Sequence, residues 1–343
     1  MRMAKKEKKK SWKEIQRERQ IKQQRAQESY QKQMEKEAKK KPRKWPKGKI
    51  FLAICLISIV LGVYGAWLYT NSTASDGNTP VTPTFGFIYI KPDGQVSPST
   101  APISNDGDSH YTLTANIADP IIIGKDNIVI DGANHLIQGI GELGSSGIDL
   151  SGRSNVTVKN LEITGFDYGI YLASASDNVI SQNYFTNNYC GIWIVSSSNE
   201  NTVSDNNIEN NEMYAIWLKE SSNNKISKNE ITAHDNYTIY VRASNFTTFS
   251  ANNIVDSRLG IFFYEASDNI LYHNNFINNM HPYASTDSTN VWDNGASGNY
   301  WSDYTVIYPE AEESNDSGIW DIPYVIDDYN QDNYPLINWW TQG

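Results

Sequence analysis

The chain has 343 residues, with 29 Lys and Arg against 39 Asp and Glu, a formal net charge of −10, and two cysteines. This length allows one large domain or two small ones. The two cysteines, Cys55 in an apolar run and Cys190 far beyond it, exclude a disulfide framework. The charge is sharply divided: residues 1–49 carry 20 basic and 6 acidic residues, a net of +14, whereas residues 50–343 carry 9 basic and 33 acidic residues, a net of −24.

Residues 1–49 form a basic tail without the apolar stripe that a packed helix requires. We expect this tail to lie in the cytoplasm and to act as a topology signal. Contact with anionic lipid headgroups is a second role, because basic residues near such a surface contribute about 1 kcal/mol each. Nucleic acid is disfavoured as a partner, since no interleaved aromatic residues and no recognisable binding fold accompany the charge.

Residues 50–69, IFLAICLISIVLGVYGAWLY, form a run of 20 residues without a charge. As a helix this run would be about 30 Å long, the thickness of a hydrocarbon core. It therefore predicts a transmembrane helix that anchors the chain in a lipid bilayer. The basic flank precedes the run, so the positive-inside rule orients the N-terminus towards the cytoplasm and everything later towards the outside. A cleaved signal peptide would require a shorter basic segment and a small-residue cleavage site.

The rest of the chain divides into four predicted segments. Residues 70–84 are a Ser-, Thr- and Pro-rich linker. Residues 85–153 read as an N-terminal cap and first coil, with short strands expected at residues 111–113 and 121–123. Residues 154–289 form a repeat, and residues 290–343 form a C-terminal cap.

The repeat consists of apolar columns with a step of 22–24 residues. One column contains Val158, Ile180, Val203, Ile226, Phe249 and Leu271. A second contains Ile163, Phe185, Ile208, Ile231, Ile254 and Phe276, and a third contains Ile170, Ile192, Ile216, Ile239 and Ile261. Such a period indicates stacked units that are each too small to bury their own apolar side.

Each unit contains two short runs of alternating apolar residues separated by polar turns, which predicts short parallel strands. An all-β fold follows: a single-stranded parallel β-helix with 22–24 residues per coil. An asparagine column at one coil position supports stacking, because side-chain amides can hydrogen-bond along the axis. Its members are Asn183, Asn206, Asn229, Asn252 and Asn274. After residue 289 the period fails and Trp and Tyr become dense, as expected of an aromatic cap over the last coil.

The coils with Gly-Ile-Tyr-Leu at 169–172 and Gly-Ile-Trp-Ile at 191–194 resemble the repeats of NosD-like proteins. The segments IYIKPDGQVSPSTAPI and DNIVIDGANHLIQG, and the tail SGNYWSDY…GIWDIPYVIDDYNQDNYPL, are similar to archaeal surface members of that family. The resemblance covers residues 86–338 and implies a right-handed parallel β-helix. The family name implies copper-site maturation, while the same repeats occur in carbohydrate-binding proteins, sugar epimerases and polysaccharide lyases.

An outward row of aromatic residues is the sharpest functional pattern. In the Gly-Ile-x-Leu motif the apolar residues face inward, so the residue x faces outward. Five coils place an aromatic residue there: Tyr171, Trp193, Trp217, Tyr240 and Phe262. Stacked rings would form an apolar platform about 20 Å long, on which sugar rings could stack beside polar residues such as Lys219. The competing interpretation is that the row only stabilises the stack.

Catalytic residues are less well indicated. Glu220, Arg242 and Glu265 lie along the same coils and are the candidates for a lyase or epimerase. The two glutamates are two coils apart, about 10 Å, which is too loose a spacing to define a mechanism. A His234–Asp235 pair could serve as a general base, but a pair in a turn is more often solvated.

Metal ligands are also sparse. Copper requires clustered His, Cys or Met, and only His273, Met280 and His281 lie close together in the sequence. This pattern argues against copper. Asp328, Asn330 and Asp332 alternate as oxygen ligands do in calcium loops, and a degraded version of such a loop spans residues 313–321. Ordinary turn chemistry is the competing explanation for both segments.

The sequence therefore favours a membrane-anchored, extracellular β-helix that binds glycans or a cell-envelope polymer without catalysis. A polysaccharide lyase or epimerase and a copper-site maturation factor are the alternatives.

Overall fold

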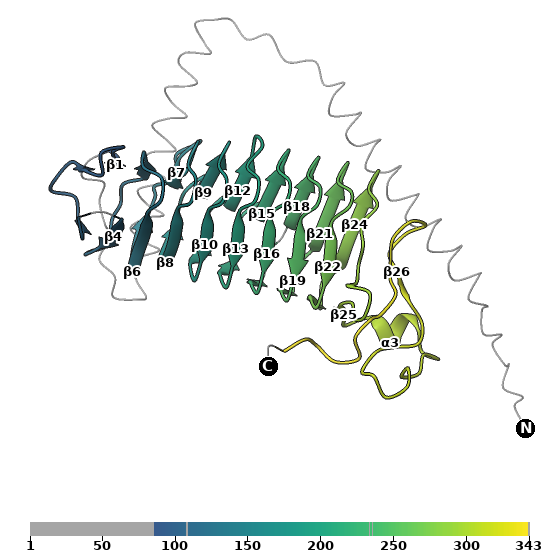
Figure 1. Ribbon diagram of the computed structural model, residues 1–343. Coiled ribbons are helices and arrows are strands. Elements are labelled where there is room, and N and C mark those ends of the chain that lie inside the picture. The colour runs from purple at the N-terminus through teal and green to yellow at the C-terminus, as the bar shows by residue number, and fades with distance from the viewer. Residues whose placement is uncertain (1–85, 108, 233, 235, 342–343) are drawn as a thin grey trace, which may run out of the picture. The chain divides into compact units, whose positions relative to one another are not determined.

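The computed structural model describes residues 86–341 apart from residues 108, 233 and 235. Strands of successive coils pair in parallel, so this part of the chain winds into the stack of coils seen in Figure 1. The only helix of the described part is the four-residue α3 (Tyr304–Ile307). The predicted all-β parallel β-helix is therefore confirmed.

The predicted basic tail (1–49), transmembrane segment (50–69) and linker (70–84) lie outside the described residues. Among the residues that are described, no helix has the length and apolar composition needed to cross a membrane.

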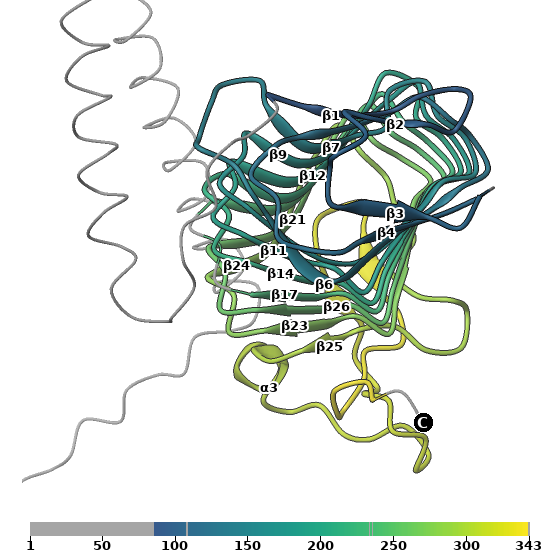
Figure 2. The same cartoon turned by 90° about the vertical axis from the view of Figure 1, so that its left-hand side faces the viewer.

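Three rows of strands form three faces of the stack, which Figure 2 shows with the coils behind one another. Face A contains β1 (Ile88–Ile90), β5 (Ile121–Ile123), β7 (Ser146–Asp149), β9 (Tyr168–Ala173), β12 (Cys190–Val195), β15 (Tyr214–Lys219), β18 (Tyr237–Arg242), β21 (Leu259–Tyr264) and β24 (His281–Thr286). Face B contains β10 (Val179–Ser181), β13 (Thr202–Ser204), β16 (Lys225–Ser227), β19 (Thr248–Ser250) and β22 (Ile270–Tyr272). Face C contains β11 (Tyr184–Thr186), β14 (Asn207–Glu209), β17 (Glu230–Thr232), β20 (Asn253–Val255), β23 (Asn275–Ile277) and β25 (Tyr300–Trp301).

Faces B and C meet at the N-terminal end of the stack. The long strand β8 (Thr157–Thr164) pairs with both β10 and β11, and it follows β4 (His110–Leu113) and β6 (Val129–Gln138) in the stack. Two antiparallel strands cover this end: β2 (Val96–Ser97) pairs with β1, and β3 (Ile103–Asn105) pairs with β4. The remaining pair, β26 (Tyr324–Val325) and β27 (Gln331–Asp332), lies near the C-terminus.

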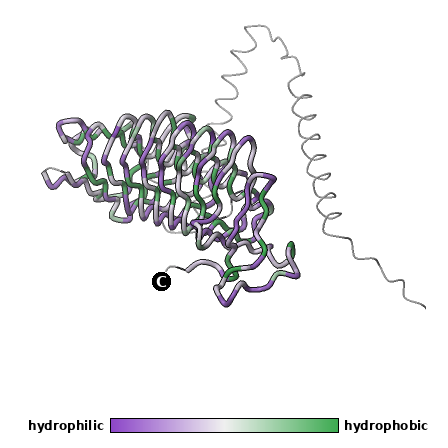
Figure 3. Tube along the Cα trace, turned by 45° about the vertical axis from the view of Figure 1, so that its right-hand side comes forward, coloured by the Kyte–Doolittle hydropathy of each residue, from purple (hydrophilic) through white to green (hydrophobic). Residues whose placement is uncertain are grey.

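The register of the strands brings the apolar columns into the interior. Val158, Ile180 and Val203 are direct neighbours on successive strands, as are Ile163, Phe185 and Ile208. All members of the three predicted columns are buried, with at most 1% of their surface exposed. Hydrophobic and hydrophilic residues accordingly alternate along each coil in Figure 3. The core is thus a continuous cylinder of Ile, Val, Leu and Phe side chains.

An asparagine ladder forms the corner between faces B and C. The residue before each ladder position, such as Gln182, Asp205 or Lys228, has a positive φ of 58–59° and turns the chain. Because of this turn, the backbone N–H of the ladder asparagine that follows has no partner on a neighbouring strand. Instead, the Asn183 backbone N–H and its Nδ2 both donate to Oδ1 of Asn206, at 3.0 and 3.1 Å.

The same relation repeats from coil to coil through Asn206, Asn229, Asn252, Asn274 and Asn299. Each Nδ2 also donates to a carbonyl in the coil before, as Asn206 does to Ile180 at 2.9 Å. One buried side chain therefore satisfies several corner groups that water cannot reach. The stacked asparagine column predicted from the sequence is confirmed.

Shorter ladders form the other corners. Asn178, Asn201 and Asn224 follow the same pattern before face B, and Ser198, Ser221 and Ser244 do so with hydroxyl acceptors. Asn188 and Asn211 begin a third asparagine ladder after face C.

Aromatic residues cover the C-terminal end of the stack. Trp301 stacks on Phe276 of the last complete coil, with ring centroids 4.4 Å apart, and Tyr324 stacks on Trp301 at 4.2 Å. Trp292, Trp301 and Tyr324 are all at most 1% exposed. These three side chains form a buried aromatic cluster against the last coil.

The ladder predicts a sharp contrast between two adjacent asparagines. Asn206→Ala should lower the free energy of unfolding by about 3 kcal/mol, because it leaves buried amide and carbonyl groups without partners. Asn207→Ala is the matched control. Asn207 is exposed and its side chain makes no hydrogen bond to another described residue, so an effect of at most about 0.5 kcal/mol is expected. Urea denaturation of both variants is the measurement, and equal midpoints would contradict the role of the ladder.

Candidate functional site

The five outward aromatic residues of the sequence pattern lie in one row on face A. Tyr171 pairs with Trp193, Trp193 with Trp217, Trp217 with Tyr240, and Tyr240 with Phe262. Each is partly exposed, while the residues on either side of it are buried. The local cause is the alternation of the strand, which sends every second side chain outward.

A second outward row lies beside the first and was missed by the sequence argument. Tyr168, Tyr214 and Tyr237 begin their strands and are also partly exposed. Strict alternation would point a residue three positions before the first row inward. Two consecutive buried residues in each strand, Gly169 and Ile170 in β9, shift the alternation and return this position to the surface. The repeated Tyr-x-Ile-aromatic motif at 168, 214 and 237 was the available signal.

The rings of the two rows stack on one another along the coils. Trp193 and Trp217 have centroids 4.7 Å apart and planes 9° apart, and Tyr240 and Phe262 have centroids 5.3 Å apart and planes 6° apart. From Trp193 to Phe262 each ring of the first row therefore covers a face of the next, whereas Tyr168 and Tyr171 are tilted by 50° and 52° against Trp193. We call this eight-ring surface the aromatic ladder; it contains Tyr168, Tyr171, Trp193, Tyr214, Trp217, Tyr237, Tyr240 and Phe262.

This geometry differs from the flat platform expected from the sequence. The ring faces are turned towards neighbouring rings, so the ladder presents ring edges and tyrosine hydroxyls to its surroundings. The indole Nε1 atoms of Trp193 and Trp217 are buried and have no hydrogen-bond partner among residues 86–341 as described. Each stacked pair contributes about 0.5–1.5 kcal/mol, so the ladder also stabilises the stack.

The tyrosine hydroxyls of the ladder stay protonated at neutral pH. Burial, and then the nearby Asp167 carboxylate, raise the pKa of Tyr168 to about 12. Burial, and then Asp149, raise the pKa of Tyr171, and burial is also the largest cause of the raised pKa of Tyr214. The ladder is therefore an uncharged surface that can both donate and accept hydrogen bonds.

The charged candidates lie along the edge of the ladder without forming a catalytic group. Lys219 pairs with Glu220, with Nζ and Oε1 3.7 Å apart, and Arg242 lies 5.5 Å from the centre of the Tyr264 ring. Glu220 and Glu265 occupy the same turn position two coils apart, with φ values of 53° and 52°. The structure thus places them along one edge and shows no contact between the two carboxylates.

The calcium candidates Asn330 and Asp332 end two asparagine ladders. Asn299 donates its backbone N–H to Oδ2 of Asp332 at 2.7 Å, and Trp301 Nε1 donates to the same oxygen at 3.0 Å. Oδ1 of Asn330 accepts the backbone N–H of Asn290 at 2.7 Å. Both side chains are buried, whereas Asp328 is exposed. Their oxygens serve the fold, so the calcium hypothesis gains no support from this geometry.

The histidines do not form a copper site in the described part of the chain. Nε2 of His273 lies 2.5 Å from Ser297 Oγ, and its ring stacks on Trp340 with centroids 3.4 Å apart. Met280 and His281 are exposed and lie on the other side of β23 from His273. Across the described residues, no three His, Cys, Asp or Glu side chains lie together as metal ligands would. The donor set does not fit copper.

His234, the other histidine of interest, is buried. Strand register places it directly between Asn211 and Ser257, in the third asparagine ladder. Within the described part of the chain, neither ring nitrogen has a partner at full hydrogen-bond geometry, although the backbone of Thr232 lies close enough to oppose the effect of burial. Only 1% of the residue is exposed. Burial lowers the pKa of His234 to about 4. The residue interrupts a ladder and is not placed to act as a general base on a ligand.

Stacked parallel coils with asparagine corners define a β-helix repeat protein. The chain belongs to the family described as periplasmic copper-binding protein (NosD), whose model matches residues 105–306, more than half of the chain. A search of curated protein sequences found none similar to this chain.

Several solved structures share part of the fold. The periplasmic alginate epimerase AlgG is 18% identical with a TM-score of 0.44, over 54% of this chain and 48% of that one. The mannuronan C-5 epimerase AlgE6 A-module of Azotobacter vinelandii is 13% identical with a TM-score of 0.30, over 57% and 55%. An alginate lyase from Paenibacillus is 11% identical with a TM-score of 0.27, over 50% and 88%. The chain thus spans about half the length of the first two, and these values are too low to carry an argument about function.

His234 generates a pH prediction. Since its pKa is about 6.5 when unfolded and about 4 when folded, the unfolded state binds a proton first as pH falls. The protein should therefore lose about 3 kcal/mol of stability from this group between pH 7 and pH 4. His234→Asn supplies a ladder amide without a titrating group, so its stability should fall less over that range. Denaturation curves at both pH values compare the two proteins, and parallel pH profiles would refute the assignment.

Proposed function

We propose that this protein binds an uncharged glycan or cell-envelope polymer along face A, without transforming it. The carrying observation is the aromatic ladder, which extends over five coils, about 20 Å, and is not part of the core. Maintaining eight partly exposed aromatic rings on one surface is unusual for a domain with no partner there.

The orientation of the rings specifies how a glycan would lie. Ring edges and methylene groups offer apolar contact, and the hydroxyls of Tyr168, Tyr171 and Tyr214 offer hydrogen bonds to sugar hydroxyls. Tyrosine hydroxyls occur on three of the five coils, and the coils of Trp193 and Phe262 carry rings alone. An extended polymer along the stack would therefore meet aromatic rings on every coil and tyrosine hydroxyls on some of them.

The charge of the chain favours an uncharged ligand. Residues 50–343 carry a net charge of −24, which repels acidic polysaccharides at long range. At the ladder edge, Lys219 and Arg242 are matched by Glu220 and Glu265, so no local excess of positive charge offsets this repulsion.

The proposal includes the placement expected from the sequence. The β-helix would stand outside the cell on the linker 70–84, with residues 50–69 in the bilayer and the basic tail 1–49 in the cytoplasm. The uncharged run and its basic flank support this orientation.

A lyase or epimerase activity on the ladder is not favoured, since Glu220, Arg242 and Glu265 do not converge on one point.

The test is a Trp193→Ala/Trp217→Ala double variant of the full chain, assayed against uncharged polysaccharides and isolated cell-envelope polymer. Loss of two ring contacts of about 1 kcal/mol each should weaken binding about 30-fold. Phe246→Ala is the control, because Phe246 is an aromatic residue that is 59% exposed and lies outside the strands of face A. Wild-type affinity in a folded double variant would refute the proposal.

A triple Tyr168→Phe/Tyr171→Phe/Tyr214→Phe variant separates binding from stability. It keeps the stacked rings and removes three hydroxyls, so its unfolding temperature should stay close to that of the wild type while polymer binding weakens. Unchanged binding by this variant would show that the hydroxyls do not contact the ligand.

A further inference from the structure

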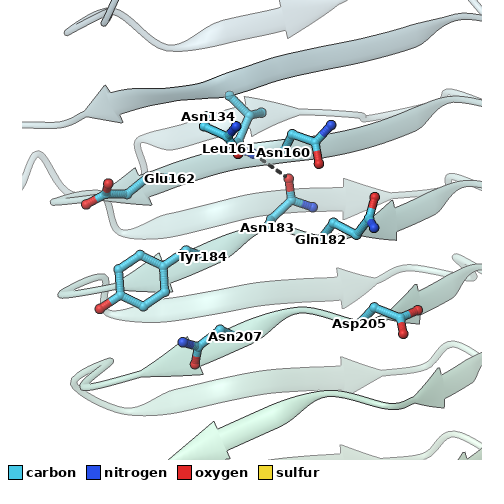
Figure 4. A pocket seen from close by; sticks show the side chains of 9 residues that line it. All are labelled: Asn134, Asn160, Leu161, Glu162, Gln182, Asn183, Tyr184, Asp205 and Asn207. Carbon is cyan, nitrogen blue, oxygen red and sulfur yellow. Dashed lines mark hydrogen bonds between the residues drawn. The ribbon is translucent and has the colours of Figure 1, made fainter.

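A groove crosses the corner between faces B and C, away from the aromatic ladder. It has a volume of about 320 Å³ and is lined by Asn134, Asn160, Leu161, Glu162, Gln182, Asn183, Tyr184, Asp205 and Asn207. Figure 4 shows these side chains, with Glu162 and Tyr184 on one side and Gln182 and Asp205 on the other. The volume lies at the lower end of the range of small-molecule sites, roughly 300–1,000 Å³.

The N-terminal wall of the groove is a bulge in β6. The register of β6 against β8 shifts between Asp131 and His135, and Ala133 and Asn134 have positive φ values of 48° and 63°. The Asp131 carboxylate holds the bulge: it accepts the Ala133 N–H at 2.9 Å and the Asn160 Nδ2 at 3.0 Å, and it pairs with Lys159 at 3.2 Å. No other coil of the repeat carries this protruding turn, so the groove is local to the first coils in the part described.

The opposite wall is Tyr184, whose orientation is fixed. Its hydroxyl donates a hydrogen bond to Oε1 of Glu209 on the next coil. Burial, followed by Glu209, raises the pKa of Tyr184 to about 12, so the hydroxyl keeps its proton. The ring therefore stands as a rigid side of the groove, with Glu162 directly paired to it on β8.

Four polar side chains face the groove without a hydrogen bond to the protein. They are Glu162, Gln182, Asp205 and Asn207, and none of their side-chain atoms has a partner among the described residues. Two of them are acceptor-only carboxylates and two are amides that both donate and accept. No Lys or Arg lines the groove, which disfavours an anionic ligand.

The separation of the two carboxylates restricts the chemical class of ligand that the groove can bind. Glu162 and Asp205 lie on opposite sides of the groove in Figure 4 and do not converge on a single point, as the ligands of one ammonium group or one cation would. Acceptors spread around a groove beside one aromatic ring suit a ring that bears several hydroxyl donors.

We propose that this groove binds an uncharged mono- or disaccharide, held by Glu162, Gln182, Asp205 and Asn207 and packed against Tyr184. The site is separate from the aromatic ladder and does not depend on polymer binding there.

The test is saturation-transfer NMR on the full chain with uncharged hexoses, N-acetylhexosamines and their disaccharides, and with glucosamine and glucuronate as charged probes. At least one uncharged sugar should bind, and a Gln182→Ala/Asn207→Ala variant should weaken it about tenfold or more. Glucuronate should not bind. Absence of binding by every uncharged sugar, or binding of glucosamine alone, would overturn the proposal.

Two matched variants complete the experiment. Glu162→Gln should weaken sugar binding, whereas Glu230→Gln, in the same column of face C but outside the groove, should not. The Trp193→Ala/Trp217→Ala variant should bind the sugar as the wild type does, which separates this site from the aromatic ladder. Equal loss in the Glu162 and Glu230 variants would place the sugar elsewhere and overturn the assignment.

Discussion

The structure depends on satisfying the backbone amides at its corners. Short strands can satisfy one another from coil to coil, but a turn between two faces breaks the strand pairing at every coil. The asparagine ladder resolves this conflict inside the protein, since each amide accepts from one coil and donates to its neighbours. Because the corners are fixed in this way, the three faces keep a constant register over the whole repeat.

That register controls the chemistry of face A. Strands about 4.8 Å apart force neighbouring rings into stacking distance, so the aromatic side chains contact one another before they contact a ligand. The surface left for recognition is made of ring edges and neutral hydroxyls. The groove between faces B and C lies where this register is interrupted, beside the bulge in β6.

Much of this architecture could be predicted from the sequence. The apolar columns gave the coil length and parallel pairing, and the column that contains Asn183 and Asn206 gave the ladder, because both are strictly periodic. Periodic reasoning was less successful where alternation shifts within a strand: Tyr168, Tyr214 and Tyr237 were missed because of the consecutive buried residues before the first row. The orientation of the rings could not be predicted either, because the spacing of residues in the sequence determines where a side chain lies on the strand but not the plane of its ring.

Other features lie beyond periodic reasoning because they join distant parts of the chain. Asp332 and Asn330 resembled ligands in a calcium loop, yet they meet Asn299 and Asn290, 33 and 40 residues earlier. His234 looked like a surface turn residue because its ladder position is recognised only when Asn211 and Ser257 are seen on either side. The groove required knowledge of where β6 bulges.

The acceptor at the end of the longest ladder gives the stack a direction and a stopping point. Every asparagine in it donates its backbone N–H and its Nδ2 to the side chain at the same position of the next coil. The series ends at Asp332, whose side chain accepts these hydrogen bonds and has no amide hydrogen to donate. The Asp332 carboxylate therefore ends the ladder at the C-terminal end of the stack. It satisfies the N–H groups of Asn299 and Trp301 and, unlike the asparagines before it, carries no side-chain amide that would continue the series into a further coil.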